Sequence, residues 1–287
     1  MRSEDRFGLR PLWDAMFTIY AEVAKICDRH GLRYYVTDGT ALGAMRHGGF
    51  IPWDDDFDIS MPRPDYDEFR KFAPQELPEN LKFMDCWNAP EFTMLFGKVL
   101  DTRRDVVEGM EKKIGYVLSG GIGIDIFPIE GFPSGLLKKL YVKLVHAVIL
   151  RRLVFQGEKF KGNTFKGKMH CLSAIVCALL TPWLKTEADL LMALERLVLC
   201  SSFDESEYTA RTCSQRSIFR RVPLRKEVWG KPTPVEFDGS VVMVPEDCDS
   251  YLRNEFYQWD YHEFPPEDKQ HPTHSYSEHR SWWLGPL

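Results

Sequence analysis

Four aspartates occupy five positions of the segment HGGFIPWDDDFDI, directly after two glycines and between aromatic residues: Asp54, Asp55, Asp56 and Asp58. Carboxylates this close repel one another, and the repulsion raises the pKa of some of them. A folded chain tolerates such a cluster where water solvates it or where a cation is bound. The segment therefore indicates either an acidic surface loop or a metal site, and the rest of the sequence has to distinguish the two.

A strand at this position would sort the four carboxylates by face. If residues 54–60 are extended, Asp54, Asp56 and Asp58 share one face, and the intervening apolar side chains point into the core. Asp55 then lies on the other face, and we expect it at a solvated entrance to the strand. Same-face carboxylates suit Mg²⁺ or Mn²⁺, because hard cations take oxygen ligands from one or two carboxylates and from phosphate.

A second acidic position lies in the stretch GIGIDIFPIE. Extended, it places Ile122, Ile124 and Ile126 on one face and Asp125 on the other, beside glycines that permit close approach of a ligand. A lone charge in an apolar strand is costly unless it is paired. We expect Asp125 either to complete a metal site with Asp56 and Asp58 or to form a buried salt bridge with an arginine.

The stretch LRYYVTDGTALGAMRH predicts a short strand, a tight turn and a helix capped by Thr40. The backbone N–H groups of Gly39 and Thr40 at a helix N-terminus form a cradle for phosphate. The acidic cluster follows about 15 residues later. A turn that binds phosphate, facing a strand that binds a metal ion, is an arrangement typical of nucleotidyltransferases.

The remaining patterns predict an α+β protein with a mixed β-sheet flanked by helices. Apolar residues at helical spacing indicate a helix over residues 11–30 that ends at Gly31. Strands are expected at NLKFMDCW, EFTMLFGKVL and GIGIDIFPI, and an Asp-Gly pair predicts a hairpin in VEFDGSVVMVP. Residues 134–200 are Leu-, Lys- and Arg-rich, so we interpret residues 1–287 as one domain with a helical insertion at about 134–200.

Bulk properties restrict the function and the compartment. The formal net charge of −5 gives no general attraction to nucleic acid. Seven cysteines without a CxxC pair, and an N-terminus without an apolar signal region, favour reduced thiols in the cytoplasm. Residues 136–155 combine an apolar face with five basic side chains. This pattern fits either peripheral contact with a membrane or a helix packed on the core with a solvated basic face.

These segments together resemble the LicD (fukutin-type) phosphotransferases of the nucleotidyltransferase superfamily. The resemblance is carried by DGTALGAMRHGGFIPWDDDFDISMPRPDYDEF, FGKVLDTRR, GIDIFPIEG and a C-terminal stretch from VPEDCDSYLRNEF to HPTH. It implies metal-dependent transfer of a phospho-alcohol, such as phosphocholine, from a CDP-linked donor to a hydroxyl of a cell-surface glycan of the lipopolysaccharide, teichoic acid or capsule type. A lipid-linked acceptor would place the enzyme at the inner face of the membrane.

The resemblance also implies roles for individual residues. It assigns Asp54, Asp56, Asp58 and Asp125 to the metal, with the last three also catalytic. It assigns donor binding to five residues, namely Gly39 and Thr40 of the turn and three basic residues: Arg46, Lys98 and His274.

Two other functions remain open at this point. One is a nucleotidyltransferase that forms an NDP-linked product. The other is a non-catalytic, metal-dependent glycan-binding protein. The transferred alcohol is equally open among choline, ribitol, glycerol and ethanolamine.

Overall fold

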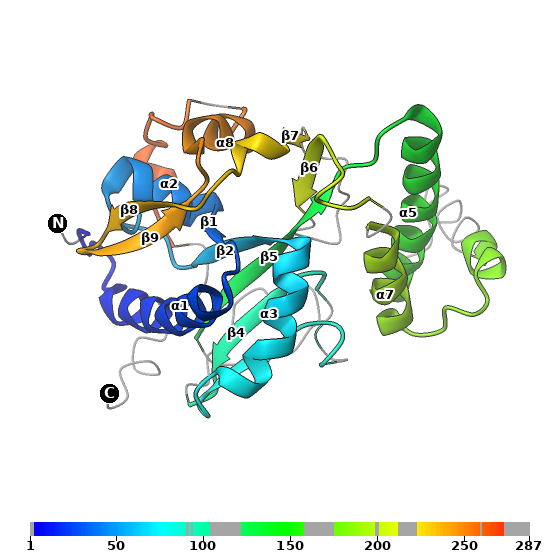
Figure 1. The fold of residues 1–287 in the computed structure, drawn as a ribbon, viewed down its shortest axis with the longest axis horizontal. Helices are drawn as coiled ribbons and strands as arrows, with labels where there is room; N and C mark the ends of the chain where they lie inside the picture. Colours follow the sequence, from blue (N-terminus) through cyan, green and yellow to red (C-terminus); the bar gives the residue numbers. More distant parts are fainter. Residues whose placement is uncertain are drawn as a thin grey trace.

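The computed structural model describes residues 3–89, 92, 94–103, 122–157, 175–198, 201–211, 223–258 and 260–272. Within these residues seven strands form one mixed sheet, and helices pack around it, which confirms the predicted α+β class (Figure 1). The sheet is mixed because β2 and β5 run parallel while the other described neighbours are antiparallel.

Strand β5 (Gly123–Gly131) is the centre of the sheet. Strand β2 (Asp58–Pro62) runs parallel along one of its edges. On the other edge, β4 (Gly97–Asp101) pairs with the beginning of β5, and β6 (Tyr208–Arg211) pairs with its end. Three shorter strands complete the sheet: β1 (Tyr35–Val36), β3 (Leu81–Met84) and β7 (Leu224–Arg225).

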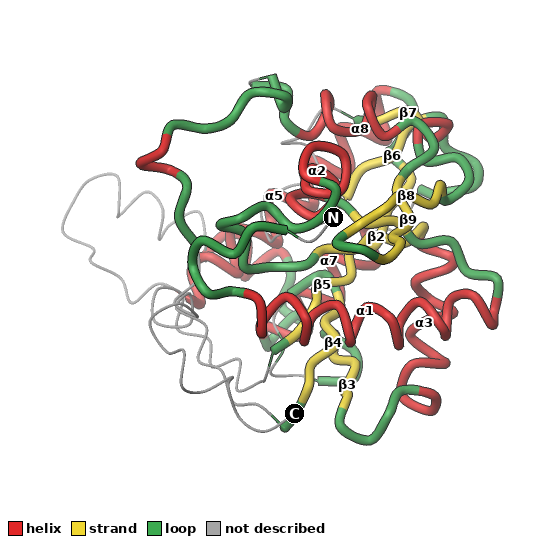
Figure 2. Tube along the Cα trace, turned by 90° about the vertical axis from the view of Figure 1, so that its left-hand side faces the viewer, coloured by secondary structure: helices red, strands yellow, loops and turns green. Residues whose placement is uncertain are grey.

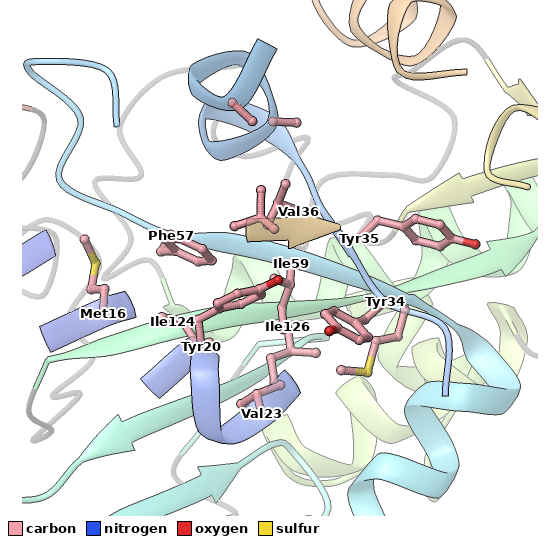
Figure 3. Packing of buried hydrophobic residues seen from close by; sticks show 14 of the residues in the cluster. Met16, Tyr20, Val23, Tyr34, Tyr35, Val36, Phe57, Ile59, Ile124 and Ile126 are labelled. Carbon is pink, nitrogen blue, oxygen red and sulfur yellow. The ribbon is translucent and has the colours of Figure 1, made fainter. Parts of the chain in front are cut away.

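Helices α1 (Arg10–His30) and α3 (Arg63–Glu76) pack against each other and against β5. The helix predicted over residues 11–30 is confirmed, and it ends at Gly31, whose φ of 65° lies in the left-handed region that glycine adopts without strain. Figure 3 shows Tyr20 and Val23 of α1 among the buried side chains of β2 and β5. Each buried large apolar side chain contributes about 1.5–3 kcal/mol, so core packing holds α1 on the sheet.

Helix α2 (Asp38–His47) lies on the side of β2 opposite to α1 (Figures 1 and 2). The predicted hairpin is confirmed as β8 (Thr233–Phe237) and β9 (Ser240–Val244), joined by a turn in which Asp238 and Gly239 both have positive φ. Helix α8 (Cys248–Glu255) packs against α2. Two short 3₁₀ helices also belong to the C-terminal part: η1 (Lys226–Val228) and η2 (Glu267–Lys269).

Helices α5 (Leu136–Gly157) and α7 (Glu187–Val198) lie at one side of the molecule, and residues 175–180 form a further short helix there (Figure 1). The chain leaves the sheet at the end of β5 and returns to it in β6, where Gly131 pairs with Thr209. The pair α5 and α7 has its own apolar cluster, separate from the main core. That residues 134–200 are an insertion within a single domain stays a prediction.

A buried network of charged side chains connects α7 to the rest of the fold. Oε1 of Glu195 on α7 lies 2.9 Å from Nη1 of Arg63 and 2.9 Å from Nη2 of Arg70, both on α3. Arg63 also pairs with Glu130 of β5, and Arg70 pairs with Asp85 after β3. Since buried charges are costly unless paired, this network fixes where α7 sits against α3 and β5.

In the part of the chain that the structure describes, we find no helix with the length and apolar character needed to cross a lipid bilayer.

Candidate active site

Three charged side chains lie next to one another across the middle of the sheet. Asp58 of β2 is the register partner of Asp125 in β5, and Lys98 of β4 is the register partner of Asp125 on the other edge. Register partners project from the same face of a sheet. Nζ of Lys98 lies 3.3 Å from Oδ1 of Asp125, so the partner of this carboxylate is a lysine, not the arginine that the sequence suggested.

The acidic segment before β2 is held against α1. The indole Nε1 of Trp13 donates a hydrogen bond of 2.7 Å to the carbonyl of Asp54, and the strand ladder begins only at Asp58. The expectation that Asp55 lies at a solvated entrance is wrong, since it is only 1% exposed. The contact with α1 places the middle of this segment inside the fold, whereas Asp54 and Asp56 stay partly exposed.

The N-terminus of α2 lies against the acidic segment. A Cβ atom on Gly39 would overlap the carboxylate of Asp54, so a larger residue here would displace that side chain. The side-chain oxygen of Thr40 accepts a 2.9 Å hydrogen bond from the backbone N–H of Asp58. These contacts bring the predicted phosphate cradle and the predicted metal-binding strand together.

The helix begins earlier than the sequence indicated. Thr37 is the N-cap residue, and Thr40 lies in the first turn, so the prediction that Thr40 caps the helix is wrong. The chain enters the helix at Asp38 because the backbone N–H of Asp38 donates to the hydroxyl of Tyr251 on α8, at 2.9 Å. Gly39 and Thr40 consequently occupy first-turn positions, where N–H groups have no partner within the helix.

The carboxylates of this region raise one another's pKa. Burial raises the pKa of Asp58 well above its ordinary value, and the charges of Asp56, Asp38 and Asp125 raise it further. Burial also raises the pKa of Asp54, with a further contribution from Asp56. A cation bound here would relieve both effects, because it would neutralise the repulsion and replace the lost solvation of the carboxylates.

Asp58 and Asp125 are the neighbouring carboxylates of the site that could serve as ligands of Mg²⁺. Among the described residues, no group of three or more His, Cys, Asp or Glu side chains is gathered in a geometry that holds a metal ion. Mg²⁺ is usually bound in proteins by one or two carboxylates, with phosphate and water oxygens in its other positions. The neighbouring carboxylates of Asp58 and Asp125 fit that requirement, and the four-aspartate ligand set stays a prediction.

An arginine that sequence reasoning missed supports the N-terminus of α2. Arg211 of β6 binds Asp38 through both terminal nitrogens, at 2.5 Å and 2.6 Å, and also binds Glu255 of α8 at 2.8 Å. Its guanidinium lies 5.7 Å from the ring centroid of Tyr251. In the sequence, Arg211 is recognisable only as an arginine in a short strand, and such arginines are too common to indicate a role at the site. Its partner is 173 positions away.

The remaining predicted residues lie elsewhere. Arg46, near the end of α2, donates from Nη1 to the backbone carbonyls of Tyr261 and Glu263, and its guanidinium lies 4.8 Å from the ring centroid of Phe264. It therefore ties the C-terminal segment to α2, and its role in donor binding stays a prediction. His274 lies outside the described residues.

Comparison with known proteins identifies a family and relatives that this chain resembles. Residues 31–131 match the family model described as LicD/FKTN/FKRP, nucleotidyltransferase domain. The chain is 24% identical over 252 residues to the lipopolysaccharide cholinephosphotransferase LicD of Haemophilus influenzae, which covers 87% of this chain and 89% of that protein. It is also 33% identical to an uncharacterised protein of Rickettsia typhi over 61 residues, or 21% of this chain and 20% of that protein.

The family match contains the residues that the structure brings together. It begins just before β1 and ends at Gly131, the last residue of β5. It includes the start of α2, the acidic segment, Lys98 and Asp125. Helices α5 and α7, Arg211 and His274 lie beyond it.

Proposed function

Because the chain belongs to the LicD/FKTN/FKRP nucleotidyltransferase family, we propose that it transfers phosphocholine, or a related phospho-alcohol, from a CDP-linked donor to a hydroxyl of a cell-surface glycan such as lipopolysaccharide. The observation that carries this proposal is the row of Asp58, Asp125 and Lys98 on three adjacent strands, in contact with the first turn of α2. We place the reaction in the cytoplasm, as the sequence led us to expect.

The first turn of α2 binds the diphosphate of the donor. The N–H groups of Gly39 and Thr40 point out of the helix at its positive end, where an anion is stabilised by the helix dipole. Lys98 supplies a positive charge from the neighbouring strand, and this charge offsets the negative charge that develops on the phosphoryl oxygens.

Asp58 and Asp125 would hold Mg²⁺ or Mn²⁺, and Asp54 and Asp56 of the acidic segment are further candidate ligands. When bound, this cation neutralises the donor diphosphate and stabilises the departing phosphate oxygen. The protein's own contribution is to hold these carboxylates at fixed positions, because Asp58 is anchored through its backbone to Thr40 and Asp125 is paired with Lys98.

The reaction is a substitution at one phosphorus atom. The acceptor hydroxyl oxygen forms a bond to the phosphorus that carries the alcohol, and the bond from that phosphorus to the bridging oxygen breaks. The bridging oxygen leaves with the electron pair as part of CMP. The hydroxyl proton passes to a carboxylate of the site, and Asp125 is our candidate for that base. Catalysis then consists mainly of positioning and charge neutralisation.

The test is to identify the nucleotide product. The purified protein is incubated with CDP-choline and choline-free lipooligosaccharide, with Mg²⁺ or with EDTA, and CMP and pyrophosphate are separated by chromatography. We expect CMP that depends on both Mg²⁺ and acceptor. Release of pyrophosphate from CTP and a phospho-alcohol would instead support a nucleotidyltransferase. Mg²⁺-dependent glycan binding without either product would support a non-catalytic binding protein.

A matched pair of variants ties the activity to the site. Asp58→Asn removes one carboxylate from the row, and we expect CMP release to fall at least 100-fold. Asp14→Asn makes the same chemical change at an exposed position of α1 and should leave the rate unchanged. Melting temperatures with CDP-choline, CDP-ribitol, CDP-glycerol and CDP-ethanolamine, each with Mg²⁺, then identify the alcohol, because a ligand that binds only the folded state raises the melting temperature.

A further inference from the structure

The N-terminal half of α5 exposes a large apolar face. Its inner face, with Val142 and Ile149, is buried against α7. Its outer face carries five large side chains that are between 53% and 82% exposed: Leu136, Leu137, Leu140, Tyr141 and Leu144. Exposed apolar side chains gathered on one surface typically mark a site of interaction.

The segment 175–184 extends this apolar surface. Its large side chains are also between 46% and 75% exposed: Ile175, Val176, Leu179, Leu180 and Trp183. Side chains from both segments line one open groove of about 600 Å³, in which Tyr141 and Leu144 face Leu180 and Trp183. The two segments therefore form one continuous surface, which we call the helical apolar surface.

Exposed lysines lie beside the helical apolar surface in the part of the chain that the structure describes. Residues 131–186 contain ten Lys and Arg residues and one acidic residue, Glu158, although the chain as a whole has a net charge of −5. Lys138, Lys139 and Lys143 are exposed among the leucines of α5, and Lys185 is exposed next to the second segment. Among the described charged side chains next to this surface, these four lysines and Arg196 outnumber Asp189, which also lines the groove.

We propose that the helical apolar surface docks on an anionic lipid bilayer. Leucines entering the boundary between headgroups and acyl chains contribute apolar burial, while the lysines beside them are attracted to anionic headgroups. Tyr141 and Trp183 are of the residue types that favour the membrane interface. A second copy of this chain is a less suitable partner, because pairing this surface with itself would bring like charges together.

The docking surface adds a partner to the proposed function without depending on it. A lipid-linked glycan would be presented to an enzyme that is already held at the bilayer, which raises the effective concentration of the acceptor. Vesicle binding is measured without any turnover, so the two proposals succeed or fail separately.

The experiment is co-sedimentation of the full chain with vesicles of phosphatidylglycerol and phosphatidylcholine, and with vesicles of phosphatidylcholine alone, at about 0.1 M salt. We expect binding to the anionic vesicles, with a partition coefficient at least tenfold lower for phosphatidylcholine alone and a further decrease at high salt. Absence of binding to anionic vesicles would overturn the proposal.

Two variants test the two components of binding. The double variant Leu137→Ser/Leu140→Ser removes apolar contact with the bilayer. The triple variant Lys138→Glu/Lys139→Glu/Lys143→Glu removes the electrostatic attraction to anionic headgroups. Each should lower the partition coefficient at least tenfold. All five positions are exposed, so the melting temperature should stay within about 2 °C of wild type. Val241→Ser and Lys82→Glu make matched changes at exposed positions of β9 and β3 and should bind like wild type.

Two further results would contradict the docking surface, and one would support it. Wild-type binding by both multiple variants would show that the vesicles are bound elsewhere. A dimer in sedimentation velocity that the leucine variant dissociates, with no vesicle binding, would show that a second copy covers the surface. Conversely, if the leucine variant loses vesicle binding but still releases CMP with a delipidated acceptor, docking is supported as a function separate from catalysis.

Discussion

Glu195 ties α7 to α3, and replacing it with alanine should lower the free energy of unfolding by about 3–5 kcal/mol, the usual cost of removing one partner of a buried ion pair. The side chain is only 3% exposed and receives hydrogen bonds from Arg63, Arg70 and the indole of Trp87. Both arginines keep a second carboxylate, Glu130 or Asp85, so the loss should not exceed this range.

The loss can be expressed as a melting temperature. An unfolding entropy of about 2.1 cal/mol/K per residue gives roughly 0.6 kcal/mol/K for 287 residues, so the expected decrease is about 5–8 °C. Calorimetry at pH 7 measures it. Glu79→Ala, at an exposed position before β3, is the matched control and should change the melting temperature by about 1 °C or less.

The pH dependence tests the cause. Burial opposes ionisation of Glu195, but Arg63 and Arg70 outweigh it and hold the pKa of this carboxyl below its ordinary value of 4.5. A group with a depressed pKa in the folded state contributes stability that is complete above 4.5 and is lost as the pH falls through the folded pKa. The difference between wild type and Glu195→Gln should therefore be largest at neutral pH and shrink in acid. A Glu195→Ala variant as stable as wild type, or a difference independent of pH, would refute the reasoning.

Three further predictions concern the candidate site. Gly39→Ala places a methyl group against the carboxylate of Asp54, so we expect at least a tenfold loss of CMP release with a decrease in melting temperature of only a few degrees. Arg211→Lys keeps the charge but cannot bind Asp38 through two nitrogens; donor affinity from a thermal-shift titration should fall at least tenfold, and an unchanged affinity would remove Arg211 from the support of α2. Asp58→Asn relieves repulsion among buried carboxylates. In EDTA we therefore expect its free energy of unfolding to equal that of wild type or to exceed it by up to about 1–2 kcal/mol, which calorimetry would show as an equal or higher melting temperature.

Much of the architecture followed from local patterns. The spacing of apolar residues in α1, the Asp-Gly pair of the hairpin and the alternation in β5 each concern neighbours in sequence, where the physical rules are strong. Asp58 and Asp125 were expected to meet because a lone carboxylate in an apolar strand is costly unless it is paired or binds a metal. The structure places them as register partners.

The errors arose where distant residues decide a local feature. Asp55 is buried because Trp13, more than forty positions earlier, fixes the segment against α1. The start of α2 depends on Tyr251, and the support of Asp38 depends on Arg211. The network at Glu195 was likewise invisible, since its members read as ordinary surface charges until the fold brings them together.

The return of the chain from β5 to β6 at adjacent, paired residues has a consequence for how this protein can change. Gly131 and Thr209 are neighbours whatever the connection between them contains, and each doubling of a connection's length costs only about 0.6 kcal/mol in closure entropy. The length of the segment between them can therefore change at little entropic cost while the strands that carry Asp58, Lys98 and Asp125 stay paired, provided that Arg63 and Arg70 keep the buried carboxylate that Glu195 supplies. The residues that we propose for catalysis would then be retained with the sheet. The helical apolar surface could differ from one relative to the next.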